Sequence, residues 1–160
     1  MKRFQKRNLT KVGWLLFYLY IILLLYFLFF SERYGRENIL KDYHYNLNLF
    51  KEIKRFIKYR EQLGIESFVV NIIGNVLAFA PFGFMLPLLS VRYRKYLYTG
   101  FLCLLFSFCV EGMQLISKVG IFDIDDILMN TLGGVLGIIS YIILATLLRL
   151  YQARRTKRVD

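Results

Sequence analysis

The sequence predicts an all-α, polytopic membrane protein with four transmembrane helices and one amphipathic helix at the outer face. The composition is too apolar for a soluble domain, because 57% of the 160 residues are hydrophobic and the mean hydropathy is +0.45. The apolar residues also form four blocks, each close to the length that a helix needs to cross a bilayer. We expect these spans at about residues 13–30, 68–90, 96–117 and 127–148, in one membrane domain of residues 13–148.

The first span follows a basic N-terminus. Residues 1–12 carry five Lys or Arg and no acid, and an uninterrupted apolar run follows. A basic start of this kind also occurs in signal peptides, but this run is long and aromatic and no small-residue cleavage site follows it. We therefore expect it to remain as the first helix, with Trp14, Tyr18 and Tyr20 toward the inner interface.

Residues 31–67 form the only sizeable polar region. Apolar residues recur there at helical spacing between basic ones, which predicts an amphipathic helix on the membrane surface with its basic face toward anionic headgroups. A solvated helix packed on the spans has the same periodicity and stays an alternative. The apolar positions are Leu49, Phe50, Ile53, Phe56 and Ile57. His44 has no second His or Cys nearby, so we predict no zinc site.

The second and fourth spans contain residues that shape helix packing. A proline inside a spanning helix predicts a kink, and glycines let another helix approach closely. Asp123 is placed to cap the fourth helix, while Asp125 and Asp126 in its first turn favour the positive end of its dipole. Structural roles are predicted for Pro81, Gly83, Gly133, Gly134 and Gly137.

The distribution of basic residues predicts the orientation. The termini, residues 1–12 and 149–160, carry five Lys or Arg each, and the link at 91–95 carries three. The loop at 31–67 carries eight, and the last link carries only Lys118. Because basic residues near helix ends are retained inside, we expect a multi-pass protein of the cytoplasmic membrane with both termini cytoplasmic.

In this topology the unusual polar residues converge near the outer ends of three spans. Ionisable groups at membrane depth cost about 2.5 kcal/mol or more each, so they are functional candidates. We predict that these side chains, from different helices, form a ligand-binding site at one depth. They are Asn71, Asn75, Glu111, Gln114, Asp123, Asp126 and Asn130.

These residues also stand in spaced motifs. The motifs are Asn71-x-x-Gly74-Asn75, Glu111-x-x-Gln114 and Asp123-Ile124-Asp125-Asp126, followed by Asn130-Thr131-Leu132-Gly133-Gly134. With them the chain resembles the VanZ-like family of bacterial membrane proteins over roughly residues 43–145. For the founding members, this resemblance implies resistance to teicoplanin and related lipoglycopeptides. The partner that it implies is a membrane lipid or a lipid-linked cell-wall precursor, or the glycopeptide itself.

Three hypotheses follow, and we favour the first. The polar cleft binds or shields an envelope precursor or lipid. In the second, the chain is an enzyme: Glu111 and Asp126 act as acid and base, or Glu111, Asp123 and Asp126 bind Mg²⁺ or Ca²⁺, although no nucleophile beside a base and no phosphate-binding loop is present. In the third, the polar residues only join helices.

The sequence gives less information about cofactors and macromolecular partners than about the membrane topology. A divalent cation is the one cofactor that the carboxylates are suited to bind, and none is predicted from a cofactor motif. Nucleic acid is a poor explanation of the net charge of +11, since the basic residues lie at helix ends where topology accounts for most of them. The oligomeric state is left open.

Overall fold

The computed structural model describes residues 2–30, 42–63 and 69–156. Four of its helices are long and apolar enough to cross a membrane, which confirms the all-α polytopic prediction. The spanning segments are Asn8–Phe30, Asn71–Leu89, Tyr96–Ile116 and Ile124–Arg155. The helices that contain them are α1 (Lys2–Phe30), the π-helical turn η2 (Val69–Ile73) continued by α5 (Gly74–Leu89), α6 (Tyr96–Ile116) and α7 (Ile124–Thr156).

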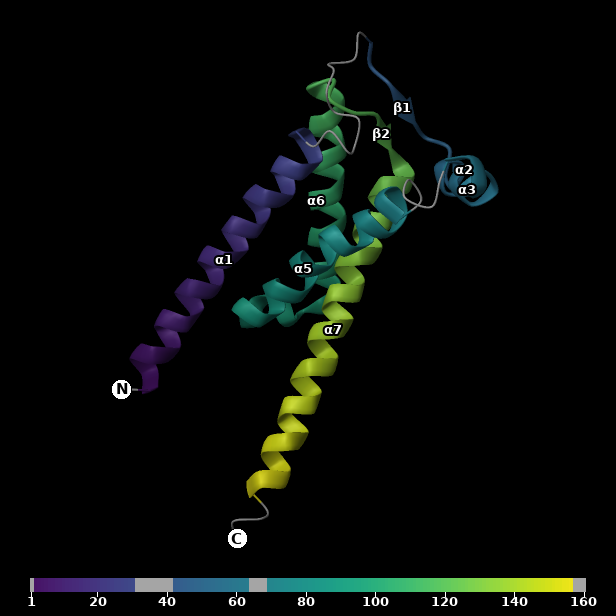
Figure 1. Ribbon diagram of the computed structural model, residues 1–160. Coiled ribbons are helices and arrows are strands. Elements are labelled where there is room, and N and C mark those ends of the chain that lie inside the picture. The colour runs from purple at the N-terminus through teal and green to yellow at the C-terminus, as the bar shows by residue number, and fades with distance from the viewer. Residues whose placement is uncertain (1, 31–41, 64–68, 157–160) are drawn as a thin grey trace.

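Both termini lie at the same end of the molecule (Figure 1). The opposite end holds α3 (Arg60–Leu63) and a set of elements that we call the polar end, formed by residues 44–58 and 121–126. The polar end contains the strands β1 (Tyr45–Asn46) and β2 (Phe122–Asp123), the helix α2 (Lys51–Lys58) and the first residues of α7.

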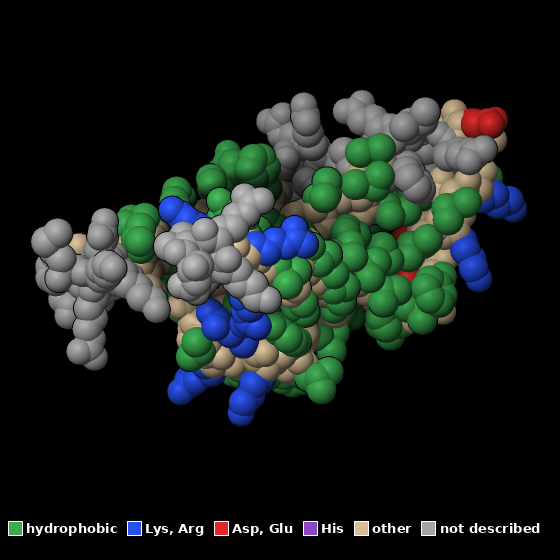
Figure 2. Space-filling model, turned by 90° about the horizontal axis from the view of Figure 1, so that it is seen from below, with side chains coloured by type: hydrophobic (Ala, Val, Ile, Leu, Met, Phe, Trp, Pro, Cys, Tyr) green, Lys and Arg blue, Asp and Glu red, His purple; other side chains and the backbone are tan. Residues whose placement is uncertain are grey.

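Exposed basic side chains mark the end that carries the termini. Seen from that end, Lys and Arg side chains gather in a group on a largely hydrophobic surface (Figure 2). The 3₁₀ helix η3 (Val91–Arg94), which links α5 to α6, contributes to it. The exposed basic residues of η3, the following link and the last part of α7 are Arg92, Arg94, Lys95, Arg149, Arg154 and Arg155.

The closest helix contact is between α5 and α7, which cross obliquely (Figure 1). A Cβ atom added at Gly83 would overlap the backbone of Gly134, and one added at Gly137 would overlap the carbonyl oxygen of Ala80. Gly133 stands in the same relation to the carbonyl oxygen of Val76. The two backbones therefore touch, which only glycine permits at these positions.

Helix α1 packs on α5 and α6 through two apolar clusters. Phe17 and Phe82 belong to the first cluster, and Leu28 and Phe79 to the second. Tyr20 lies between them, and its hydroxyl donates a hydrogen bond to the carbonyl of Ala78 in α5 (2.6 Å). Tyr20 therefore joins α1 to α5. A half-buried hydroxyl needs a partner, and α5, which contains Pro81 and Pro87, provides one.

The amphipathic helix α2 begins at Lys51, two residues later than its apolar pattern indicated. Leu49 and Phe50 precede it, and Phe50 adopts a left-handed conformation (φ 64°) that ends the helical register. One face of α2 packs inward through Phe56, while Ile57 is exposed. The helix therefore both contacts the bundle and presents basic residues outward.

The two short strands were not expected from the sequence. β1 and β2 pair in parallel, with Tyr45 opposite Phe122 and Asn46 opposite Asp123. The N–H of Phe122 also donates to the carbonyl of His44 (3.1 Å). Two residues are too few to show a strand alternation, so this pairing left no periodic signal.

Candidate functional site

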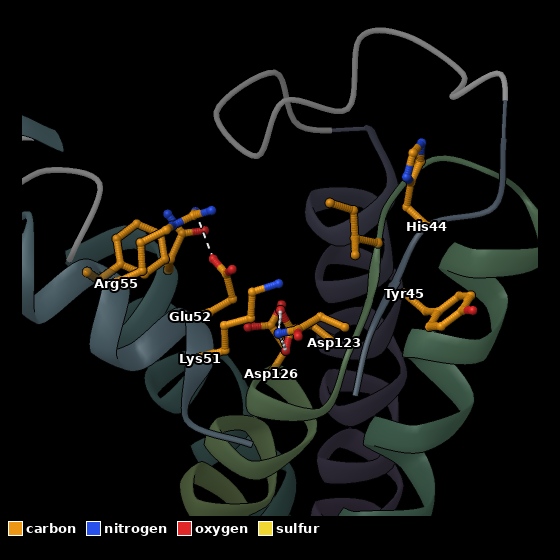
Figure 3. A pocket seen from close by; sticks show the side chains of 11 residues that line it. His44, Tyr45, Lys51, Glu52, Arg55, Asp123 and Asp126 are labelled. Atoms are coloured by element: carbon orange, nitrogen blue, oxygen red, sulfur yellow. Dashed lines mark hydrogen bonds and ion pairs between the residues drawn. The ribbon is translucent and has the colours of Figure 1, made fainter. Parts of the chain in front are cut away.

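A pocket of about 400 Å³ opens at the polar end, between α2, the two strands and the start of α7 (Figure 3). Its lining combines basic, acidic and amide side chains with two apolar ones. The lining residues are His44, Tyr45, Asn46, Lys51, Glu52, Arg55, Phe56, Asn71, Ile121, Asp123 and Asp126.

Asp123 is the centre of the hydrogen-bond network beneath this pocket. Its Oδ1 accepts from the N–H of Asp125 (2.8 Å), which confirms the predicted cap of α7. Both of its carboxylate oxygens accept from the amide Nδ2 of Asn46 (3.2 Å each). The backbone N–H of Asp123 donates to Oε2 of Glu111 (3.2 Å). One residue thus joins α6, α7 and β1.

Asp125 caps a different helix from the one that contains it. Its Oδ1 accepts from the N–H of Phe50 (2.5 Å), and its Oδ2 accepts from the N–H groups of Glu52 (2.9 Å) and Ile53 (3.3 Å). These groups open α2, which has no side-chain cap of its own. The buried carboxylate therefore satisfies the start of α2 and meets the positive end of that helix dipole.

Asp126 connects the pocket to the second span. Its Oδ1 accepts from Nδ2 of Asn75 (2.8 Å), and Asn75 is itself buried. Asn71, one turn earlier on the second span, is half-buried and lines the pocket. The structure therefore brings Asn71, Asp123 and Asp126 to the pocket, with Asn75 directly behind Asp126.

The other three predicted site residues lie inside the bundle and do not line the pocket. Glu111 is 2% exposed, and Gln114 and Asn130 are 1% exposed. Nε2 of Gln114 donates to the carbonyl of Leu28 (3.0 Å), and so satisfies one of the last carbonyls of α1. Oδ1 of Asn130 is buried with no hydrogen-bond partner among the described residues.

Several pocket residues were not identified from the sequence as site residues. Asn46 reaches Asp123 only through the strand pairing. Lys51 and Arg55 were interpreted solely as the basic face of α2. Arg55 forms an ion pair with Glu52 (2.7 Å), and in Figure 3 the Lys51 side chain reaches toward Asp123 and Asp126 while His44 points away. Only the basic pattern of α2 in the sequence hinted at them.

The predicted carboxylates Glu111, Asp123 and Asp126 each take part in a different hydrogen bond. Across the described ranges, no three His, Cys, Asp or Glu side chains are grouped so that they could hold a metal ion. The Glu111 carboxylate accepts a hydrogen bond from the backbone N–H of Asp123. Two carboxylates that bind one cation would instead both direct oxygens toward it. The arrangement suits hydrogen bonding and charge recognition of a polar ligand.

Burial raises the pKa of Asp123 above its usual range. The hydrogen bonds from Asp125 N–H and the Asn46 amide oppose this shift, the charge of Asp125 adds to it, and the charge of Lys51 opposes it. The other carboxylates near Asp123 are Glu111, which accepts from its backbone N–H, and Asp126, which lines the same pocket.

We expect a pH-dependent stability from this residue. Because the pKa of Asp123 is higher in the folded state, the folded state binds the Asp123 proton more tightly than the unfolded state. Protonation of Asp123 therefore adds to the free energy of unfolding. This added stability is fully present below the unfolded pKa and is lost as pH rises through the folded pKa. Thermal unfolding of wild type and Asp123→Asn in detergent, from about pH 4 to pH 7, checks this. The stability of the wild type should rise relative to the variant as pH falls, and parallel curves would contradict the shift.

Comparison with known proteins places this site in context. The chain matches the VanZ/LLP1 family over residues 17–145. It is 33% identical over 130 residues to protein VanZ of Enterococcus faecium, an alignment that covers 77% of this chain and 69% of that protein. No solved structure matches.

Proposed function

The chain belongs to the VanZ/LLP1 family, and from this premise we propose that it contributes to resistance against teicoplanin-type glycopeptides at the bacterial cytoplasmic membrane. In this proposal both termini are cytoplasmic and the polar end faces outward. The pocket binds the polar part of an envelope lipid or lipid-linked cell-wall precursor and so shields it from the antibiotic.

One observation carries the proposal: a charged pocket lies at the end of the bundle opposite the termini. Its volume is in the range of pockets for small molecules and headgroups, about 300–1,000 Å³. The exposed basic residues at the other end support the orientation, since basic helix ends are retained inside. A ligand reaching this pocket from the outer leaflet would be held at the surface where a glycopeptide acts.

We assign a structural role to two of the predicted polar residues, which their hydrogen bonds support. Gln114 holds the end of α1, and Asn75 holds Asp126, so both serve helix packing. Asn71, Asp123 and Asp126 line the pocket, and we assign ligand contact to them together with Lys51.

Teicoplanin susceptibility tests the proposal. Cells that express the wild type should survive higher teicoplanin concentrations than cells with empty vector. Lys51→Ala should lose most of this protection, because a lost charged hydrogen bond weakens ligand binding about tenfold or more. Lys54→Ala is the matched control, since Lys54 is exposed on the same helix but outside the pocket. Equal susceptibility of wild type and empty vector, at verified membrane levels, would refute the resistance role.

A further inference from the structure

We infer that the pocket selects a ligand carrying a primary ammonium group close to an anionic phosphate or carboxylate, with the ammonium on the Asp126 side and the anion on the Lys51 side. This inference rests on the proposed function, because it names the chemistry of the ligand of the same pocket. It follows from the distribution of charge over the lining.

The charges of the lining do not cancel locally. Two side chains of the lining, Lys51 and Arg55, are basic, and three are carboxylates. Arg55 and Glu52 neutralise each other in their ion pair (2.7 Å). Lys51 then faces two carboxylates, Asp123 and Asp126 (Figure 3). Among the described lining residues the carboxylates thus outnumber the basic groups by one, and Lys51 and the two aspartates present opposite charges to a ligand.

The acidic side of the pocket is rich in acceptors. Asp123 accepts from the Asn46 amide and the Asp125 N–H, Asp126 accepts from the Asn75 amide, and a carboxylate can accept about four hydrogen bonds. A group with several N–H donors, such as a primary ammonium, suits this surface.

The basic side of the pocket is available for an anion. Lys51 is exposed, and no carboxylate of the described residues lies within ion-pair distance of its ammonium group. An ammonium with three donors can bind a phosphate or a carboxylate equally well. The two sides of the pocket therefore recognise opposite charges on one ligand.

The surroundings of the pocket are apolar. Leu47, Leu49 and Ile57 are exposed on or beside α2, and Ile121, half exposed, lines the pocket itself. These side chains suit a ligand whose charged part is attached to a lipid chain. A primary ammonium close to an anionic group occurs in a phospholipid headgroup that has an amine. It also occurs in the amine-bearing stem peptide of a lipid-linked precursor.

Titration of the purified full chain in nonionic detergent tests this inference. Side-chain amide NMR signals of Asn46 and Asn75 report directly on Asp123 and Asp126. The probes are dihexanoyl-phosphatidylethanolamine, the phosphatidylcholine and phosphatidylglycerol with the same chains, and a soluble lysine-containing stem pentapeptide. Phosphatidylcholine has no N–H donor and phosphatidylglycerol has no cation, so both should bind about tenfold or more weakly than the best amine-bearing probe.

Two variants locate the charges. Asp126→Asn can still accept from Asn75 but removes the negative charge, and Lys51→Ala removes the exposed cation; each should weaken the amine-bearing probe about tenfold or more. Lys54→Ala should leave binding unchanged. Preference for the phospholipid or for the peptide identifies the source of the amine, and either preference supports the inference.

If phosphatidylcholine or phosphatidylglycerol binds as tightly as the best amine-bearing probe, or if no probe binds, the inference is overturned. If cells are still protected from teicoplanin in that case, the proposed function stands without this ligand class. If amine-bearing probes bind selectively but the protein gives no protection, the ligand class stands and the resistance role fails. The two experiments therefore separate the two failures.

Discussion

Alanine at Gly137 or Gly133 is expected to destabilise the protein by about 3 kcal/mol or more. The added Cβ atom would overlap the carbonyl oxygen of Ala80 or of Val76, which are backbone atoms that no rotamer change can move aside. α5 and α7 would have to separate along their closest contact. The thermal midpoint and the yield of monodisperse protein in detergent measure this effect.

Two other glycines give matched controls for that experiment. Gly100 and Gly112 both lie in α6, and a Cβ atom added at either meets nothing within 4 Å. Alanine there should leave stability unchanged or raise it by up to about 1 kcal/mol, because alanine favours helix more than glycine does. A Gly137→Ala variant as stable as Gly112→Ala would show that the α5 and α7 backbones are not in contact.

Replacing Asp125 with alanine is expected to release α2 from the bundle. Three backbone N–H groups at the start of α2 would lose their acceptor, and hydrogen bonds to a charged group contribute about 1.5–3 kcal/mol each. Amide hydrogen exchange should therefore accelerate at Glu52 and Ile53, while the amides of α5 and α7 remain protected. Teicoplanin protection should fall as well, since α2 contributes Lys51 and Arg55 to the pocket.

The control for this effect is Glu52→Ala in the same first turn of α2. It removes a partly exposed ion pair with Arg55, and such pairs contribute only about 0–1 kcal/mol. Asp125→Asn should be intermediate, because an amide keeps one acceptor oxygen but places an NH₂ group opposite the other N–H donors. Unchanged exchange at Glu52 in Asp125→Ala would contradict the capping role.

These two expectations describe how the site is held. The glycine contact sets the position of α7 against α5, and so brings Asn75 within hydrogen-bond distance of Asp126. Asp125, one residue earlier, fixes α2 over the same region. The rigid contact between the spans thus supports a pocket whose second wall is a short surface helix held by one carboxylate.

The sequence alone determined the number of spans and part of their local structure. Length and hydropathy are properties of contiguous residues, so four apolar runs predicted four spanning helices. The cap by Asp123 is likewise local, because its acceptor and the N–H of Asp125 are two residues apart. These predictions needed no knowledge of which helices are neighbours.

The tertiary structure alone decided which polar residues face the pocket. Asp125 had been expected to favour its own helix, but its partners lie 72 to 75 residues earlier in the chain. Asn46 reaches Asp123 across 77 residues through a strand pair too short to leave a pattern. Glu111 and Gln114 were predicted for the site but are buried in the bundle interior. A buried polar group takes whichever partner the folded backbone brings within about 3 Å, and residue spacing along the chain carries no record of that choice.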